Sequence, residues 1–471
     1  MTFTSTLVRP WPLPARYAGP IWWVLGFVTL TACLVPVLYS RFSLLLLAAG
    51  PAAIGIFLLI GHPHWGILLI LCFWFSGFSP ALLEAEFLRI PYLISAVLLV
   101  PLVLRVALER QLRAFEFREV RILAAIGVLL LLSTWWAELD HSNVLLPELD
   151  RSRLQLVRFG SRFVFLIYFA GFMVDRKRIE WTVWTILLLI FVAAATSWTK
   201  VLGGEAIDRA GATFGFASNS NRLAFLCLFA AAIIWFYRSD GARGGVRRML
   251  SPLLFFFPVT ALATGSRGGM LQLLALVAVV LGQRAVSAAR RVQSLVMIAC
   301  VAVLLFALVP QSLLQRAVSY GAQRNAPGSK SLRTRIWQLE SARDLFLAHP
   351  LIGIGPGNYD WMSRSTAGPG DTAHNSYLLA LTEGGVVLFS LYLALFATLL
   401  RSVRRIEREG LEDLRWLGKS LRAGLVLFLI ASATGDIWLE DPIYWIIALS
   451  IAVSALSFPT LSPSPARPVR A

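Results

Sequence analysis

The sequence predicts an all-α polytopic membrane protein, because three features of its composition agree on that fold class. Hydrophobic residues make up 57% of the 471-residue chain, and Asp, Glu, Lys and Arg together make up only 15%. Soluble domains have about 45–50% apolar and about 25% charged residues, so this chain has too few charges to coat several of them. The mean hydropathy of +0.71 fits a protein that turns much of its surface toward lipid.

Apolar segments long enough to cross a bilayer recur along most of the chain. A spanning helix needs about 20 predominantly apolar residues, within a range of about 17–25. We expect about 12 spans, in a range of 12–14, because two candidates are short enough to be partial, re-entrant or merged helices. The candidate segments are 21–39, 42–60, 65–78 (short), 90–106, 120–136, 159–174, 181–198, 223–237, 252–264 (short), 269–286, 292–309, 376–400, 421–436 and 442–458.

The distribution of Lys and Arg between these segments predicts the orientation of the chain. Cytoplasmic loops of membrane proteins collect Lys and Arg. With the N-terminus inside, 26 of the 43 Lys and Arg lie on the inner side, and seven of the other 17 lie in the single loop 310–375. We therefore expect both termini in the cytoplasm, with connections 137–158, 199–222, 265–268 and 310–375 outside. The net charge of +17 then reflects mainly orientation, and nucleic acid is not an expected partner.

Four regions follow from this topology. Residues 1–309 form an N-terminal transmembrane bundle and 310–375 a large outer loop, and residues 376–458 form the C-terminal transmembrane helices before a Pro-rich cytoplasmic tail, 459–471. Within the loop, apolar residues of 331–348 recur at three- and four-residue spacing, as Ile336, Leu339, Ala342, Leu345 and Phe346 do. This pattern predicts an amphipathic helix on the outer membrane face that ends before Pro350.

A glycine cluster, Gly353-x-Gly355-x-Gly357, follows the predicted helix. Its composition is similar to that of a phosphate-binding loop. No strand precedes it, however, and no helical pattern follows it directly. We therefore favour a tight turn beside the membrane.

Candidate functional residues gather in the expected outer connections. His374 precedes segment 376–400, with Asp371 or Thr372 as the expected helix cap. The positive end of a helix dipole disfavours imidazolium, so a neutral His374 can serve as a general base; the alternative is a histidine that only caps or hydrogen-bonds at the interface. Arg267 lies between two apolar segments, where a charged side chain is costly. Such a charge indicates a functional residue; the alternative is a side chain that snorkels to the outer headgroups.

Together the outer-face cluster consists of Arg209, Arg222, Arg267, Arg333, Arg335 and His374. Arginine forks bind phosphate oxygens through two parallel hydrogen bonds. The cluster therefore predicts a membrane enzyme or carrier that handles a phosphorylated lipid.

An ordered set of motifs across about residues 200–390 resembles the O-antigen ligase and polymerase superfamily of bacterial envelopes. Ser220 departs from the pattern, because many members have proline between the two asparagines. The matching pieces are Arg209 with Gly211, Asn219-x-Asn221, Ser266-Arg267-Gly268, Arg335-x-Trp337, His349-Pro350 with Gly353-x-Gly355-x-Gly357-Asn358, His374-Asn375 and Glu383-Gly384-Gly385.

The resemblance implies a multi-span glycosyltransferase of the GT-C type in the bacterial inner membrane. Its activity would be an inverting, metal-independent transfer on the periplasmic face. The implied partners are a donor O-antigen glycan on undecaprenyl diphosphate, a lipid A-core acceptor with a reactive sugar hydroxyl, and membrane lipids. The product would be complete lipopolysaccharide. No cofactor or metal is expected, and no Asp-x-Asp motif occurs in the sequence.

The resemblance also implies roles for individual residues. Arg209 and Arg267 would clamp the leaving diphosphate, with Arg333 and Arg335 supplied by the loop. His374 would take the proton of the acceptor hydroxyl or orient that hydroxyl. The supporting residues would be Arg222, Asn219, Asn221, Asn375 and Glu383. For Glu383, pairing with a functional arginine and a structural salt bridge both stay open.

Three alternatives to a ligase remain at this point. An O-antigen polymerase and a protein O-oligosaccharyltransferase use the same donor chemistry, although protein-glycosylating relatives usually carry additional C-terminal sequence. A lipid-linked sugar transporter belongs to a different class. It would place charges deep in its spans, whereas the charges of this sequence concentrate at the outer ends.

Overall fold

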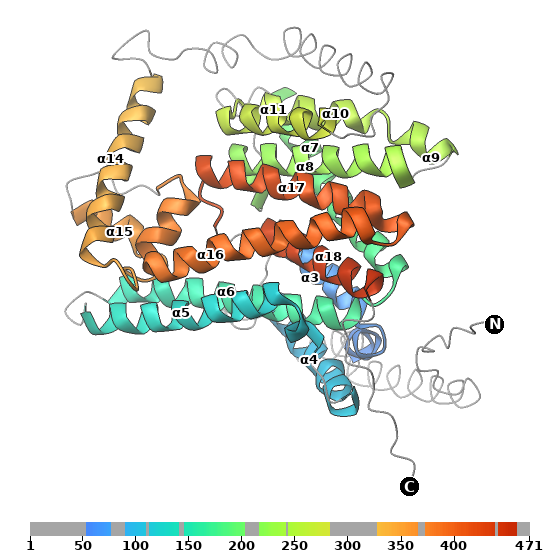
Figure 1. Cartoon of the computed structure of the whole chain (residues 1–471), viewed down its shortest axis with the longest axis horizontal. Coiled ribbons are helices and arrows are strands. Elements are labelled where there is room, and N and C mark those ends of the chain that lie inside the picture. Colours follow the sequence, from blue (N-terminus) through green and yellow to red (C-terminus); the bar gives the residue numbers. More distant parts are fainter. Residues whose placement is uncertain are drawn as a thin grey trace, which may run out of the picture.

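In the part of the chain that the computed structural model describes, the regular elements are all helices, as the predicted all-α class requires (Figure 1). The structure describes residues 53–76, 90–109, 113–140, 146–202, 216–241, 244–282, 327–365, 373–438 and 441–458. Its α-helices are α3 (Pro63–Ser76), α4 (Ile90–Glu109), α5 (Arg118–Asp140), α6 (Leu146–Phe172), α7 (Arg176–Leu202), α8 (Ser220–Phe236), α9 (Gly244–Met249), α10 (Leu253–Ala263), α11 (Arg267–Leu281), α14 (Pro327–Ala348), α15 (Tyr359–Ser365), α16 (Ser376–Glu409), α17 (Arg415–Thr434) and α18 (Asp441–Ser457).

Within these ranges, seven helices are long and apolar enough to span a membrane: Arg118–Ala137, Arg151–Phe172, Arg176–Leu202, Ser220–Gly241, Gly245–Ala263, Ser376–Glu409 and Glu412–Thr434. Helices Ala53–Gly61 and Pro63–Phe75, bent by 114°, qualify together as a broken or re-entrant eighth span. The chain is thus a polytopic membrane protein. The count of 12–14 spans stays a prediction, since segments 21–39 and 292–309 lie outside the described residues.

The short segments that the sequence marked as ambiguous do not stand alone. Segment 65–78 falls in α3, which continues the bent pair from Ala53–Gly61. Segment 252–264 joins the preceding residues into the span Gly245–Ala263. Both are therefore parts of broken or extended helices.

Helix α8 pairs with α17 in antiparallel fashion near the middle of the bundle (Figure 1). The rings of Phe225 on α8 and Phe428 on α17 lie 5.9 Å apart. Gly424 gives Phe229 its space, because a Cβ at Gly424 would lie 2.4 Å from the Phe229 ring. Close approach through small residues is a principal way in which membrane helices associate. This packing places the start of α8 beside the end of α17.

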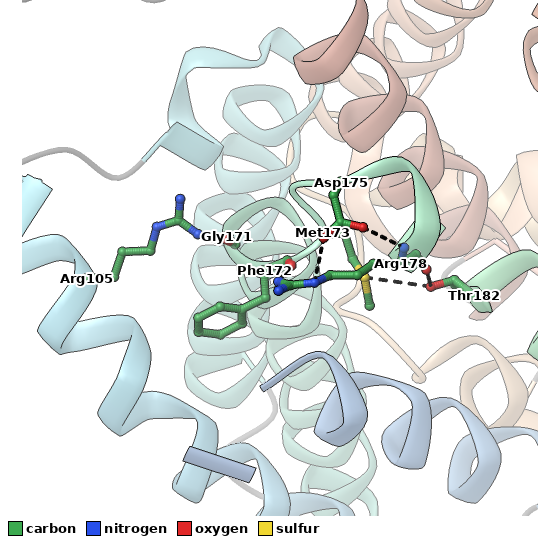
Figure 2. A network of polar contacts seen from close by, with 7 residues as sticks. All are labelled: Arg105, Gly171, Phe172, Met173, Asp175, Arg178 and Thr182. Atoms are coloured by element: carbon green, nitrogen blue, oxygen red, sulfur yellow. Dashed lines mark hydrogen bonds and ion pairs between the residues drawn. The ribbon is translucent and has the colours of Figure 1, made fainter. Parts of the chain in front are cut away.

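Basic side chains bind the last carbonyl groups of α6, at the turn between α6 and α7 (Figure 2). Asp175 accepts the backbone N–H of Arg178 at 2.9 Å and pairs with its guanidinium at 2.8 Å. Arg178 also donates to the carbonyl of Phe172 at 2.8 Å, and Arg105 donates to that of Gly171. Cations are favourable at a helix C-terminus, where the last carbonyls lack partners within the helix. These arginines, counted above as orientation signals, therefore also close α6.

Helix α16 is broken at Gly385, where φ is 68° and ψ is −175°. The carbonyls of Thr382 and Glu383 accept the N–H groups of Ile354 and Gly355, both at 3.0 Å. Val386 in turn donates its N–H to the carbonyl of Pro350 at 2.8 Å. Unpaired backbone groups are costly in a membrane, so the glycine-rich loop replaces the bonds that the break removes.

The break also turns the start of α16 sharply back on the rest of the helix. The rings of Tyr377 and Tyr392 have centroids 6.3 Å apart, although fifteen residues separate them in the sequence. A straight helix would hold their Cα atoms about 22 Å apart. Residues 376–384 are therefore a separate short helix that leads into the break.

We predict that Gly385→Ala destabilises the protein. A Cβ at this position would lie 2.3 Å from the carbonyl oxygen of Leu351, and the positive φ strains any L residue. The expected loss in the free energy of unfolding is at least about 1–3 kcal/mol. Thermal unfolding in detergent, followed by tryptophan fluorescence, measures it.

Gly160→Ala is the matched control, since nothing lies within 4 Å of a Cβ at that helical position. It should be neutral or slightly stabilising, because alanine favours a helix over glycine. Equal midpoints for Gly385→Ala and the wild type would refute the importance of the break.

Candidate functional site

The ends of four helices that are distant in the sequence meet at one end of the bundle. Ser266, which precedes α11, donates to Oδ1 of Asn221 on α8 at 2.7 Å. Ser376, the first residue of α16, donates to the carbonyl of Gly435 at 2.9 Å and accepts the N–H of Ile437 at 2.8 Å. These bonds join the starts of α8, α11 and α16 to the end of α17.

A pocket of about 150 Å³ lies at this junction. It combines amides, a guanidinium, an imidazole and a carboxylate with a few apolar side chains. A small set of convergent polar groups in a concave site is typical of ligand-binding sites. The residues that line it are Asn219, Asn221, Arg222, Phe225, His374, Ala431, Gly435, Asp436 and Ile437.

His374 is held in this pocket by an uncommon backbone conformation. Its φ is +45°, the only positive value among the non-glycine residues that the structure describes. Such conformations persist only where surrounding bonds enforce them, and they concentrate at functional sites. Here the enforcing residue is Asn375, whose side chain accepts the N–H groups of Tyr377 at 3.0 Å and Leu378 at 3.3 Å.

Asn375 is therefore the N-cap of α16, and the expectation that Asp371 or Thr372 caps this helix was wrong. A cap residue must directly precede the first helical turn to reach its free N–H groups. Because Asn375 is the cap, His374 is the residue immediately before it, and His374 lines the pocket.

Arg222 and Asp436 link the two walls of the pocket. Arg222 of α8 donates to the backbone carbonyl of Asp436 at 3.1 Å, across the gap between α8 and the segment after α17. Asp436 contributes the only carboxylate among the lining residues. It was missed because it is the last residue of the apolar segment 421–436. The available signal was an acidic residue after a glycine at the end of a span.

Arg267 begins α11 next to the pocket but is not among its lining residues. Ser266 caps the helix by accepting the N–H of Gly269 at 2.9 Å. The two glycines after Arg267 allow close contact, since a Cβ at Gly268 would lie 2.4 Å from Thr434 of α17. The Ser-Arg-Gly-Gly sequence thus brings the start of α11 against the end of α17.

The glycine-rich loop forms a tight turn whose N–H groups bind the protein itself. Gly353 donates to the carbonyl of His349 at 3.1 Å, and Gly355 donates to that of Glu383 at 3.0 Å. Ser152 of α6 donates to the carbonyl of Pro356 at 2.6 Å. Since these groups are already engaged, the loop is not arranged to bind a phosphate, in agreement with the interpretation favoured from the sequence.

Glu383 supports this loop, and its partners differ from those expected. Among the described residues, its carboxylate accepts the backbone N–H groups of Tyr359, at 3.4 Å, and Gly357 rather than pairing with an arginine. The side chain is buried beneath the loop. Burial, with Asp360 and Glu383 nearby, raises the pKa of Tyr359, whose hydroxyl donates to the carbonyl of Gln338 at 2.8 Å. Both residues therefore act in the architecture of the loop.

The remaining predicted arginines fall partly outside the described residues. Arg335 lies exposed on α14 and does not line the pocket. Arg333 lies on the same helix, but its side chain is outside the described part, as is the whole of Arg209. Helix α14 itself was predicted correctly, although of its expected apolar face Ala342 and Leu345 are buried while Ile336 and Leu339 are exposed.

These features define a polytopic helical membrane protein with a polar pocket at the ends of several spans. Residues 252–393 match the O-antigen ligase family, a range that includes Arg267, the glycine-rich loop, His374 and Glu383. Over this range the chain is similar to the O-antigen ligase family, in agreement with the resemblance that its motifs indicated. Comparison with curated proteins finds no match. The family match ends before Asp436 and begins after Arg222, so the pocket joins residues inside and outside the matched range.

We predict that Glu383→Ala loosens the loop and lowers thermal stability. It leaves two backbone N–H groups without an acceptor, at roughly 1–3 kcal/mol for each buried group. Glu383→Gln keeps one acceptor oxygen and should lose less. Differential scanning calorimetry in detergent compares the two variants. Equal unfolding temperatures for both would contradict the role given to the carboxylate.

Proposed function

We propose that this protein is an O-antigen ligase, which moves O-antigen glycan from undecaprenyl diphosphate to a sugar hydroxyl of lipid A-core. The observation that carries the proposal is the pocket, which joins His374 to Arg222, Asn219 and Asn221 from a part of the chain about 150 residues earlier. The family match over residues 252–393 supports the chemistry. The predicted orientation places the pocket on the periplasmic side of the inner membrane.

Arginines near the pocket stabilise the leaving group in this proposal. The bond between the anomeric carbon and the diphosphate oxygen breaks, so negative charge grows on the diphosphate. Fixed cations lower the energy of that transition state. Arg222 lines the pocket and Arg267 begins the adjacent helix. Arg209 and the α14 arginines Arg333 and Arg335 remain candidates for contacts with the same group. Because the arginines supply the positive charge, the reaction needs no divalent ion.

His374 accepts the proton of the acceptor hydroxyl, and Asp436 stabilises the charge that results. As the acceptor hydroxyl oxygen attacks the anomeric carbon from the face opposite the diphosphate, it transfers its proton to the imidazole of His374, and the configuration inverts. General-base catalysis of this kind contributes about 10²–10⁴ in rate. The carboxylate of Asp436, on the same pocket wall as Ile437, stabilises the imidazolium that forms. Asn219 and Asn221 supply amides that orient sugar hydroxyls.

Deletion of the gene followed by lipopolysaccharide electrophoresis tests the function. A ligase predicts core-only lipopolysaccharide, with full-length polymer stranded on the lipid carrier. Core that carries a single repeat unit would instead identify a polymerase. Unchanged lipopolysaccharide with an altered glycoprotein pattern would identify a protein O-oligosaccharyltransferase.

We predict that His374→Ala fails to restore long-chain lipopolysaccharide to the deletion strain. Loss of the base should reduce transfer by about 100-fold or more. The protein should still insert, as immunoblotting of membranes will show. His62→Ala is the control, because His62 is exposed on the bent pair, outside the residues that line the pocket. Full complementation by His374→Ala would remove the proposed role.

A further inference from the structure

Helix α16 presents an exposed stripe that begins after the break at Gly385. The exposed residues in its first part are apolar or small, namely Val386, Val387, Ser390, Leu393 and Ala397. From Val387 onward they are three or four residues apart, which places them on one face of the helix. Since α16 is one of the candidate spans, this face is the part of the helix that meets lipid.

Three arginines continue the same stripe toward the end of the helix. Arg401, Arg404 and Arg408 follow the last of the apolar and small residues at intervals of four, three and four, and all three are exposed. The opposite face of this part of α16 is turned to the bundle, because Val403 and Ile406 are fully buried. The stripe is thus apolar along the span and basic beyond it.

These arginines lie at the depth of the lipid headgroups. Arg401 is fifteen residues after Val386, or about 22 Å along the helix axis, and Arg408 is about 33 Å from Val386. The hydrocarbon layer of a bilayer is about 30 Å thick, and the headgroup phosphates border it. The side chains therefore reach the phosphate layer of the same lipids whose tails contact the apolar part of the stripe.

The neighbouring helix α5 brings two more exposed arginines to the same end. The two helices pack side by side (Figure 1), and Ser402 of α16 donates to the carboxylate of Glu119 near the start of α5. Arg118 and Arg121 are exposed beside that contact. Trp136, fifteen residues or about 22 Å after Arg121, is exposed near the other end of α5. Since tryptophan is enriched at membrane interfaces, the arginines of α5 fall at the opposite interface.

The acidic side chains at the end of α16 are bound to residues outside the stripe. Glu407 pairs with Arg422 of α17 at 3.0 Å, and Glu409 pairs with Arg405 at 3.3 Å. The guanidinium of Arg405 also lies over the ring of Phe458, 4.0 Å from its centroid. Arg405 is therefore held against the bundle and does not belong to the stripe.

A role in orientation accounts for the number of these arginines but not for their direction. The positive-inside rule counts Lys and Arg near the ends of spans, whichever way their side chains face. Other basic residues at this end bind acidic side chains, since Arg176 pairs with Asp413, and Lys419 with Asp240 at 2.7 Å. The arginines of the α16 stripe instead continue a face that meets lipid.

We propose that this end of the α5 and α16 face binds the headgroup of an anionic phospholipid, in the leaflet that is cytoplasmic in the predicted orientation. Arg401 and Arg404 are one turn apart, so both guanidinium groups bind the lipid phosphate through forked hydrogen bonds. Arg408 and the exposed arginines of α5 add positive charge, which favours an anionic over a zwitterionic headgroup. The exposed Glu116 precedes Arg118 by two residues, so the test uses the α16 arginines. The proposal does not depend on which reaction the pocket performs.

Site-specific photo-crosslinking of the full-length protein tests this site. The photoreactive amino acid p-benzoylphenylalanine is placed at Ala397, one turn before Arg401 on the exposed stripe. The protein is reconstituted in vesicles of equal amounts of phosphatidylglycerol and phosphatidylcholine, and mass spectrometry measures the ratio of the two lipids captured on illumination. One arginine near a membrane surface favours anionic lipid by about fivefold. We therefore expect a captured ratio of phosphatidylglycerol to phosphatidylcholine of about five or more.

Variants and a second probe position keep the result interpretable. Arg401→Gln/Arg404→Gln/Arg408→Gln should lower the captured ratio toward one. Arg404→Gln alone changes one exposed residue and should lower the ratio severalfold without altering thermal unfolding. Arg248→Gln removes an exposed arginine of α9 and should leave the ratio unchanged. The same cross-linker at Leu188, an exposed residue of α7, should capture the two lipids about equally. Excess inorganic phosphate should not change the ratio at Ala397.

Four outcomes would overturn the proposal. Equal capture of the two lipids at Ala397, or an unchanged ratio in the folded triple variant, would exclude an anionic lipid site. Reduced thermal stability of Arg404→Gln with an unchanged ratio would assign this arginine to ion pairs within the protein. Equal enrichment at Leu188 and Ala397 would indicate a general surface potential instead of a site. Loss of the enrichment in inorganic phosphate would indicate a site for a free anion.

Discussion

The end of the bundle that holds the pocket depends on the exchange of backbone hydrogen bonds between the broken helix α16 and the loop from Pro350 to Gly355. Without it, the carbonyl of Thr382 would lose the N–H of Ile354, and that of Glu383 would keep only the hydroxyl of Ser133 from outside its own helix. The break lets residues 376–384 turn back on the helix, which in turn brings Ser376 to Gly435. The pocket forms at that contact. The break in α16 is thus what brings His374 to the end of α17.

Much of the architecture could be predicted from the sequence, because helices that cross a membrane are long and strongly apolar. Apolar segments found by length alone correspond to helices throughout the described ranges, and the helix over 331–348 follows from periodicity. Bends were harder to predict. The 114° angle after Gly61 and the reversal at Gly385 depend on backbone bonds to distant segments. Local hydropathy does not encode such bonds.

The residues of the candidate site could be selected from the sequence, but their interaction partners were harder to predict. His374, Arg222, Asn219 and Asn221 were selected because they stand at outer ends of spans, and the structure places them around one pocket. Their functional roles remain predictions. Glu383 was expected to meet an arginine and instead holds the N–H groups of a loop, because it is buried where charged side chains are scarce. A carboxylate gives no indication in sequence of whether its partner is a side chain or a backbone.

The arginines that close α6 also belong to the predicted orientation signal. In the predicted topology, Arg105 and Arg178 lie at the positively charged connections that face the cytoplasm. In the finished protein the same side chains bind the carbonyls of Gly171 and Phe172 (Figure 2). A substitution at either arginine would therefore remove a bond to the last carbonyls of α6 and, in the predicted topology, one of the charges that orient the chain.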